Sequence, residues 1–198
     1  TLTYAHNVAM GFQSGTDVTS GTQNTLIGGQ AGFSITSGFG NVAIGYQALY
    51  SEDGHGTNTA LGYQTLRNQD AGAHAYNIAI GYQAGISITT GSQNTLIGGL
   101  AGDALTTGGG NVAIGEQALS AEDAHGRNTA IGYHTLAAQD AGAHAYNVAV
   151  GYEAAESITT SVHNTILVAR AGKSLKTRQK NVAIGYEALG TEDEKGFN

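Results

Sequence analysis

The chain has 198 residues, a net charge of −7, 31 glycines and no cysteine, proline or tryptophan. The lack of cysteine excludes disulfides and thiolate metal sites, and the acidic balance argues against nucleic acid as a general partner. The apolar runs are only a few residues long, so we also predict no membrane insertion.

A phrase of the type Asn-Val-Ala-Ile-Gly-Tyr recurs along the whole chain. The steps between copies are 17, 17, 17 and 19 residues, and this series repeats, so that short units lie inside a long unit of 70 residues. Such self-similarity is typical of repeat architectures. The phrase begins at Asn7, Asn24, Asn41, Asn58, Asn77, Asn94, Asn111, Asn128, Asn147, Asn164 and Asn181, and Asn198 would open another copy.

The long units divide one array that spans residues 1–198. They cover residues 7–76 and 77–146, followed by an incomplete unit at 147–198, and segment 69–77 recurs unchanged as segment 139–147. Because the chain starts and stops within the pattern, we expect it to be an excerpt from a longer fibre.

One unit, residues 41–57, illustrates the predicted turn. Alternation places Val42, Ile44 and Tyr46 on one face of a strand and Ala43 on the other. Residues 47–49 are predicted as a second, shorter strand, and residues 51–57 as a polar return loop. A 17-residue period is too short for two packed helices, and glycine disfavours helix. The sequence therefore predicts an all-β parallel β-solenoid, or β-roll, of eleven turns of 17 or 19 residues.

The residue two places after each asparagine is always apolar, and the residues on either side of it are apolar or threonine. A strand that has one face in solvent normally alternates apolar and polar residues. Here one face can fill the interior of the coil, and the other needs a partner. We expect a sister chain, most simply in a side-by-side trimer, although a roll that leaves its small residues in solvent is the alternative.

Two columns of identical residues would arise from such stacking. The eleven asparagines would form a structural ladder of side-chain amides, unless they serve only as turn residues. The tyrosines would form a stacked aromatic column, or a surface for contact with a glycan. This tyrosine column comprises Tyr46, Tyr63, Tyr82, Tyr133, Tyr152 and Tyr186.

Polar loops offer weak signals for chemistry. Glu52, Asp53 and His55 recur at positions 122, 123 and 125, but the third copy replaces the histidine with Lys195. We therefore predict solvated loop charges, with no metal site and no cofactor. The Asp70–His74 pair and its copy lack a recognisable nucleophile, and repetition is unlike an active site, so we predict that the chain is not an enzyme.

Five of the eight lysines and arginines lie in one short stretch near the end of the chain. Such a stretch could attract an anionic polysaccharide, lipopolysaccharide or nucleic acid, or it could be a neutral variation on exposed loops. Its members are Arg170, Lys173, Lys176, Arg178 and Lys180.

The repeats at residues 41–49, 58–66, 128–136 and 181–189 resemble those of phage tail fibres, and their core is similar to the head repeats of trimeric autotransporter adhesins. Glu116 and Val168 depart from the pattern. The resemblance implies a left-handed β-roll, a homotrimer and a location outside the cell, on a cell surface or on a virion. The function expected is a shaft that spaces a receptor-binding tip. The alternative is a carbohydrate-binding module that uses the tyrosine column or the long loops at 66–76 and 136–146.

Overall fold

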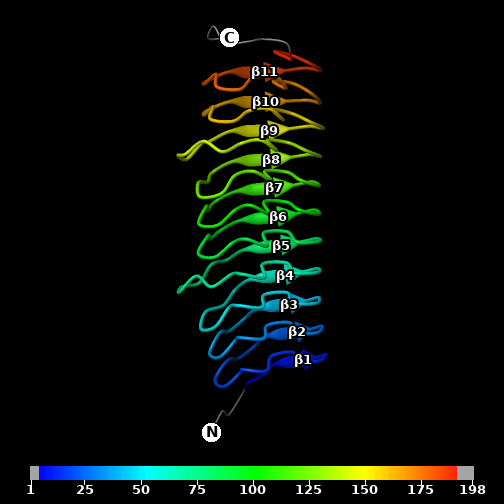
Figure 1. Ribbon diagram of the computed structural model, residues 1–198, viewed down its shortest axis with the longest axis vertical. Coiled ribbons are helices and arrows are strands. Elements are labelled where there is room, and N and C mark those ends of the chain that lie inside the picture. The colour runs from blue at the N-terminus through cyan, green and yellow to red at the C-terminus, as the bar shows by residue number, and fades with distance from the viewer. Residues whose placement is uncertain (1–4, 191–198) are drawn as a thin grey trace.

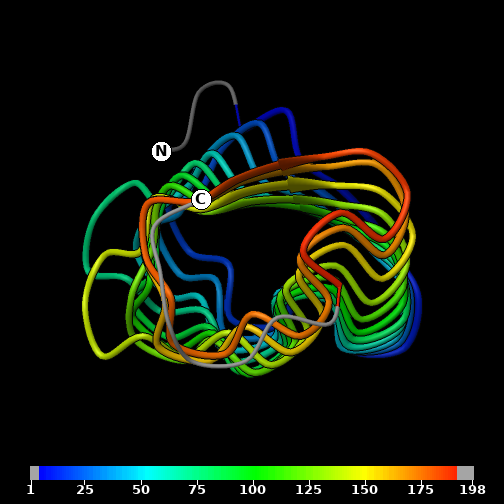
Figure 2. The same ribbon diagram turned by 90° about the horizontal axis from the view of Figure 1, so that it is seen from above.

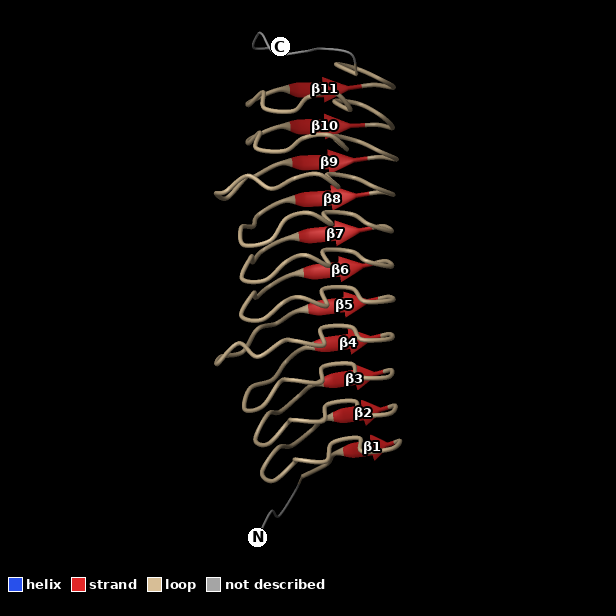
Figure 3. Ribbon diagram, in the orientation of Figure 1, coloured by secondary structure: helices blue, strands red, loops and turns tan. Residues whose placement is uncertain are grey.

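A computed structural model of the chain describes residues 5–190, which contain eleven short strands and no helix. The strands stack one above another along a single axis, with the first and the last strand at opposite ends of the stack (Figures 1 and 3). The strands are β1 (Val8–Met10), β2 (Thr25–Ile27), β3 (Val42–Ile44), β4 (Thr59–Leu61), β5 (Ile78–Ile80), β6 (Thr95–Ile97), β7 (Val112–Ile114), β8 (Thr129–Ile131), β9 (Val148–Val150), β10 (Thr165–Leu167) and β11 (Val182–Ile184).

All eleven strands form one sheet in which every neighbour is parallel and follows the previous strand in the sequence. Equivalent repeat positions pair: Ala43 of β3 lies opposite Ala60 of β4, and the other pairs keep the same register. The predicted all-β parallel solenoid is therefore confirmed. We call each strand with the segment that follows it a rung.

Each rung contains one strand, so the prediction of a second strand at residues 47–49 is wrong. Gln47 and Leu49 have φ angles of 53° and 51° and so adopt the left-handed conformation, which interrupts an extended segment. The segment is a turn instead, and it directs Ala48 and Leu49 into the buried interior.

The interior of the coil is narrow and is filled mostly by small aliphatic side chains. The middle residue of nearly every strand is buried, as in Ala43 and Leu26, whereas the residues on either side of it face outward and are half-buried or exposed. Viewed along the axis, the sheet is one wall and turns form the others; the two 19-residue turns project sideways as lobes, residues 70–76 and 140–146 (Figure 2). This arrangement confirms the predicted division between the two strand faces. The small residues line the interior, so the alternative of a roll that leaves them in solvent is wrong.

A glycine follows nearly every strand and brings successive rungs into close backbone contact. Gly98 has a φ of +135°, and a Cβ built there would lie 2.4 Å from the carbonyl oxygen of Gly115 in the next rung. Val168 is the exception at this position, with a φ of 87°. Backbone approach, rather than flexibility, requires glycine here.

Gly98→Ala is expected to destabilise the protein by at least about 2 kcal/mol, because the new methyl group meets backbone in a conformation that alanine rarely adopts. The neighbouring Gly99→Ala is a matched control, since a Cβ at that position meets nothing within 4 Å. Thermal unfolding of both variants tests this. Equal losses for the two would contradict the explanation.

Candidate functional site

The asparagine column lies at the inner edge of the sheet, immediately before each strand. Ten of its members, from Asn24 to Asn181, are at most 1% exposed, and Asn7 at the first rung is half-buried. The Oδ1 atom of each asparagine accepts the backbone N–H of the next asparagine, as in Asn94 to Asn111 at 3.0 Å. The same contact recurs at 2.9–3.1 Å through the stack.

Within the described residues, the other half of the amide ties the strand to its return loop in seven of the eleven rungs, whereas Asn58 and Asn128 donate to Glu52 and Glu122 of the rung before. The Nδ2 atom of Asn94 donates to the carbonyl oxygen of Gly108, 14 residues later, at 2.9 Å. It also lies 3.2 Å from Oδ1 of Asn77 in the rung below. An amide provides an acceptor and two donors on separate atoms, whereas an ionised carboxylate only accepts and a hydroxyl has a single donor on its acceptor atom. The column therefore joins consecutive rungs and closes most of the turns.

A second amide ladder, which was not predicted from the sequence, runs on the outside of the coil. Nε2 of each glutamine donates to Oε1 of the glutamine one rung below, at 2.8–3.0 Å. The signal was present in the sequence, because glutamine occupies the sixth position after asparagine in five consecutive units. The members are Gln13, Gln30, Gln47, Gln64 and Gln83.

The tyrosine column forms two stacks of rings beside the sheet. The Tyr46, Tyr63 and Tyr82 rings follow one another at centroid distances of 5.5 and 5.4 Å, and Tyr133 stacks on Tyr152 at 5.3 Å. The stacked rings are within 20° of parallel, and these five tyrosines remain 40–54% exposed. This is the geometry of a stacked aromatic ladder.

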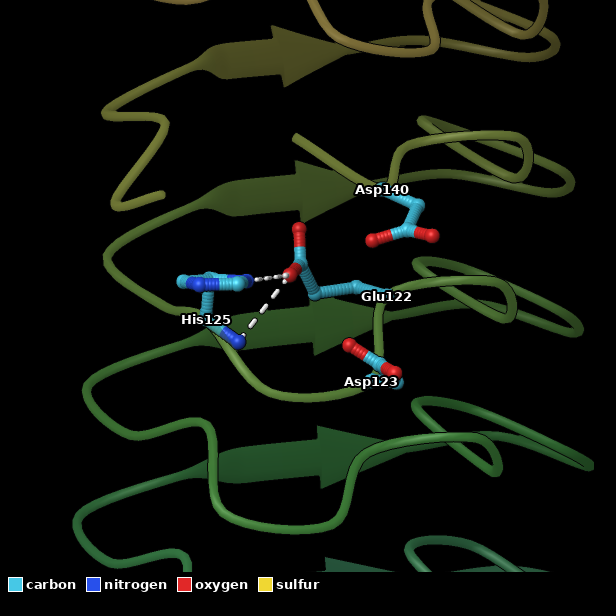
Figure 4. A group of neighbouring side chains, drawn as sticks. All are labelled: Glu122, Asp123, His125 and Asp140. Atoms are coloured by element: carbon cyan, nitrogen blue, oxygen red, sulfur yellow. Dashed lines mark hydrogen bonds and ion pairs between the residues drawn. The ribbon is translucent and has the colours of Figure 1, made fainter. Parts of the chain in front are cut away.

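Three side chains, two aspartates and a histidine, surround the buried carboxyl of Glu122. Figure 4 shows Glu122 between His125 on one side and Asp123 and Asp140 on the other. One ligand atom of each residue lies within 4.8 Å of those of the other three, and Glu52, Asp53 and His55 form a similar group. Side chains of these types are the ones that could hold a divalent cation, but both aspartates of the Glu122 group are exposed, and proximity alone does not establish a site.

The prediction of solvated loop charges is wrong for Glu52 and Glu122, both of which are 0% exposed. Oε1 of Glu122 accepts the backbone N–H of His125 at 3.1 Å, and Oε2 lies 3.5 Å from Nδ2 of Asn128. Burial, with a smaller effect of nearby aspartate charges, raises the pKa of each glutamate to about 7. The third copy, residues 192–195, lies outside the described residues.

The remaining polar candidates have structural partners. His74 packs edge-on against Phe39, with ring centroids 4.9 Å apart. In the basic stretch, Arg170 pairs with Glu187 at 2.9 Å and Lys173 pairs with Glu156 at 3.1 Å. Arg178 is only 9% exposed. Of the five basic residues, Lys176 and Lys180 are exposed, so the stretch is not the continuous basic surface that its sequence suggests.

No family model, curated protein or solved structure matches this chain. Within residues 5–190, no helix is long and apolar enough to span a membrane.

Asn94→Ala is expected to destabilise the protein by about 3 kcal/mol, because it leaves the buried N–H of Asn111 and the carbonyl of Gly108 without partners. Gln93→Ala is the control, since Gln93 is exposed. Chemical denaturation measures both. If Asn94→Ala unfolds at the same denaturant concentration as the control, the amide ladder does not stabilise the fold.

The two buried glutamates are expected to make the protein less stable as the pH rises from about 4.5 to about 7. The folded-state pKa of about 7 lies above the ordinary value of 4.5, so the folded state binds more protons in this window and loses stability as they leave. The loss is at most about 3 kcal/mol for each carboxyl. Glu122→Gln should flatten the profile of the unfolding midpoint against pH, whereas Glu116→Gln, at an exposed position, should not.

Proposed function

We propose that the chain is a structural segment of an extracellular fibre, and that several copies associate side by side to form its shaft. The observation that carries this proposal is an unbroken sheet of eleven strands whose outer face is apolar and uncovered. The function proposed is mechanical: the shaft holds a tip away from a surface.

Continuous contact between rungs supports the mechanical role. Backbone hydrogen bonds, the asparagine column and the glutamine ladder all run along the same axis, and each rung bonds to the rungs on either side. In repeat proteins, stability depends on such contacts between neighbours, so length can grow without a larger core. Repetition of a 17-residue unit can therefore build a long, stiff rod.

The outer face consists of three columns, formed by the first, third and fifth residues after each asparagine. Valine, isoleucine and threonine occupy the first column, large aliphatic residues the third, and mostly tyrosine the fifth; Glu116 is the sole charged residue in the three. Exposure is high for apolar side chains, with 42% for Ile78 and 54% for Tyr82. Monomeric proteins rarely expose a continuous apolar surface of this kind.

A second copy of the chain is the occupant that this face fits best. The face repeats at the spacing of the rungs along the whole rod, so a partner that covers it must have the same period. Another copy has that period and offers the same apolar columns, without a charge to desolvate except at Glu116. Symmetric self-association is also the commonest form of assembly. In a trimer, the outer face of each chain would be enclosed by the other two chains.

The sequence resemblance suggests two kinds of fibre, a phage tail fibre and a surface adhesin, and both are located outside the cell. Glycan binding by the tyrosine column stays an alternative prediction. A sugar ring would need a free aromatic face, and in Tyr63 both faces meet neighbouring rings. This stacking favours the structural role.

Light scattering on the chain is expected to give a multiple of 20.1 kDa, three times that mass for the trimer. The double variant Val112→Lys and Ile114→Lys places two charges on the outer face of β7 and should shift the mass to that of one chain, with the β circular dichroism retained. Ala143→Lys, on an exposed lobe, is the control. A monomer for the unmodified chain would refute the association.

A further inference from the structure

The interior of the coil repeats every four rungs rather than every rung. Three core columns show it, formed by the second, eighth and eleventh residues after each asparagine. Over four consecutive rungs, the second residue is Ala, Leu, Ala and Ala. The eighth residue is Gly, Gly, Leu and Leu. The eleventh residue is aliphatic in the first two rungs, Glu in the third and Gln in the fourth. The eleventh-residue column is Val18, Ile35, Glu52, Gln69, Ile88, Leu105, Glu122, Gln139, Ile158 and Leu175.

Large and small residues in these columns are complementary in space. Leu96 of the second-residue column projects between two glycines of the eighth-residue column, one in its own rung and one in the rung before. A Cβ at Gly85 would lie 2.8 Å from Cδ1 of Leu96, and one at Gly102 would lie 2.9 Å from Cδ2. Leu26 lies in the same way, 2.8 Å and 2.6 Å from a Cβ at Gly15 and Gly32.

The third long unit contains a coupled change that supports this complementarity. There, Ala155 replaces the glycine of the rung before, and Ile166 replaces the leucine. Both residues are 0% exposed, and Ala155 keeps the left-handed backbone with a φ of 56°. The added methyl group and the altered branching occur together, as expected if the two positions share one space.

The polar residues of the eleventh-residue column also depend on the order of rungs. Gln69 accepts a hydrogen bond from Nδ2 of Asn77 at 2.7 Å and donates to the carbonyl oxygen of Thr89 at 2.9 Å, both in the following rung. Gln139 makes the same two contacts with Asn147 and Thr159. An aliphatic residue lies next in the column in both cases.

We infer that the four-rung, 70-residue unit is the smallest length by which this rod can be extended or shortened. The backbone and the asparagine column are the same at every rung, so they would tolerate a shift of one turn. The core columns would not, because a shift brings a leucine of the eighth-residue column against a leucine of the second-residue column, at a place where the existing order has glycine. The interior thus specifies the order of turns.

Two deletions distinguish this inference from uniform stacking. Removal of residues 77–146 joins the rung of Leu66 and Gln69 directly to the rung that begins at Asn147. This junction already exists in the full chain, where Leu136 and Gln139 occupy the equivalent positions next to that rung. Removal of residues 77–93 places Leu66 where Gly85 stood, and the Cδ1 atom of Leu96 lies 2.8 Å from a Cβ at that position. The smaller deletion therefore introduces the larger clash.

Thermal unfolding of both deletion variants, followed by circular dichroism, tests the inference. The 70-residue deletion is expected to unfold cooperatively within about 5 °C of the full chain, and the 17-residue deletion at least about 10 °C below it. Uniform stacking predicts the opposite order, because the shorter array has fewer interfaces. A 17-residue deletion as stable as the 70-residue deletion would overturn the inference.

A double-mutant cycle provides a test that does not depend on a large rearrangement. Gly85→Ala should lower the unfolding midpoint by several degrees in the unmodified chain and by less when combined with Leu96→Ile, the pair found at Ala155 and Ile166. The backbone strain of alanine is the same in both backgrounds and cancels. Equal losses in the two backgrounds would show that the columns are independent and would overturn the inference.

Discussion

The fold depends on one interaction, the buried amide of an asparagine that bridges two rungs. Its oxygen accepts the backbone N–H of the next asparagine, and its nitrogen donates to the loop that closes its own turn. In most rungs both of these partners are backbone groups, so the two contacts do not depend on which side chains are nearby. Sequence variation, including the two extra residues of each 19-residue turn, can then accumulate in the loops while the strands keep their register.

A turn this small has consequences for both faces of the sheet. Its interior accommodates little more than alanine beside each strand, and a leucine there requires glycine opposite, as Leu96 and Gly102 show. In the described part of the chain, twelve leucine and isoleucine side chains are fully buried in the core, but the large aliphatic residues of the third-residue column and the tyrosines lie on the outer face. Most of the hydrophobic stabilisation that these outer residues can supply therefore depends on association.

The period, the solenoid and the division of each strand into two faces follow from the sequence, because spacing and alternation report directly on stacking and on strand faces. Which of the two faces is the inner one does not follow from the sequence, because both are apolar. The turn in place of the supposed second strand at 47–49 does not follow either, because left-handed φ angles at Gln47 and Leu49 leave no signature in side-chain type. The burial of Glu52 was hidden for a different reason. Charged residues next to glycine are typical of loops, and the aliphatic residues of the same column, such as Ile35, reveal the interior only when turns are aligned.

The buried glutamates show how the columns combine stability with specificity. An aliphatic residue in place of Glu122 would avoid a carboxyl that is held from water at neutral pH, and buried polar groups are commonly less favourable than well-packed apolar ones. A uniform aliphatic column, however, would make every rung equivalent to the next. A polar position in an apolar seam fixes register in coiled coils at a cost in stability. Glu122 and Gln139 occupy the same kind of position, once in each long unit, where one turn must be distinguished from another.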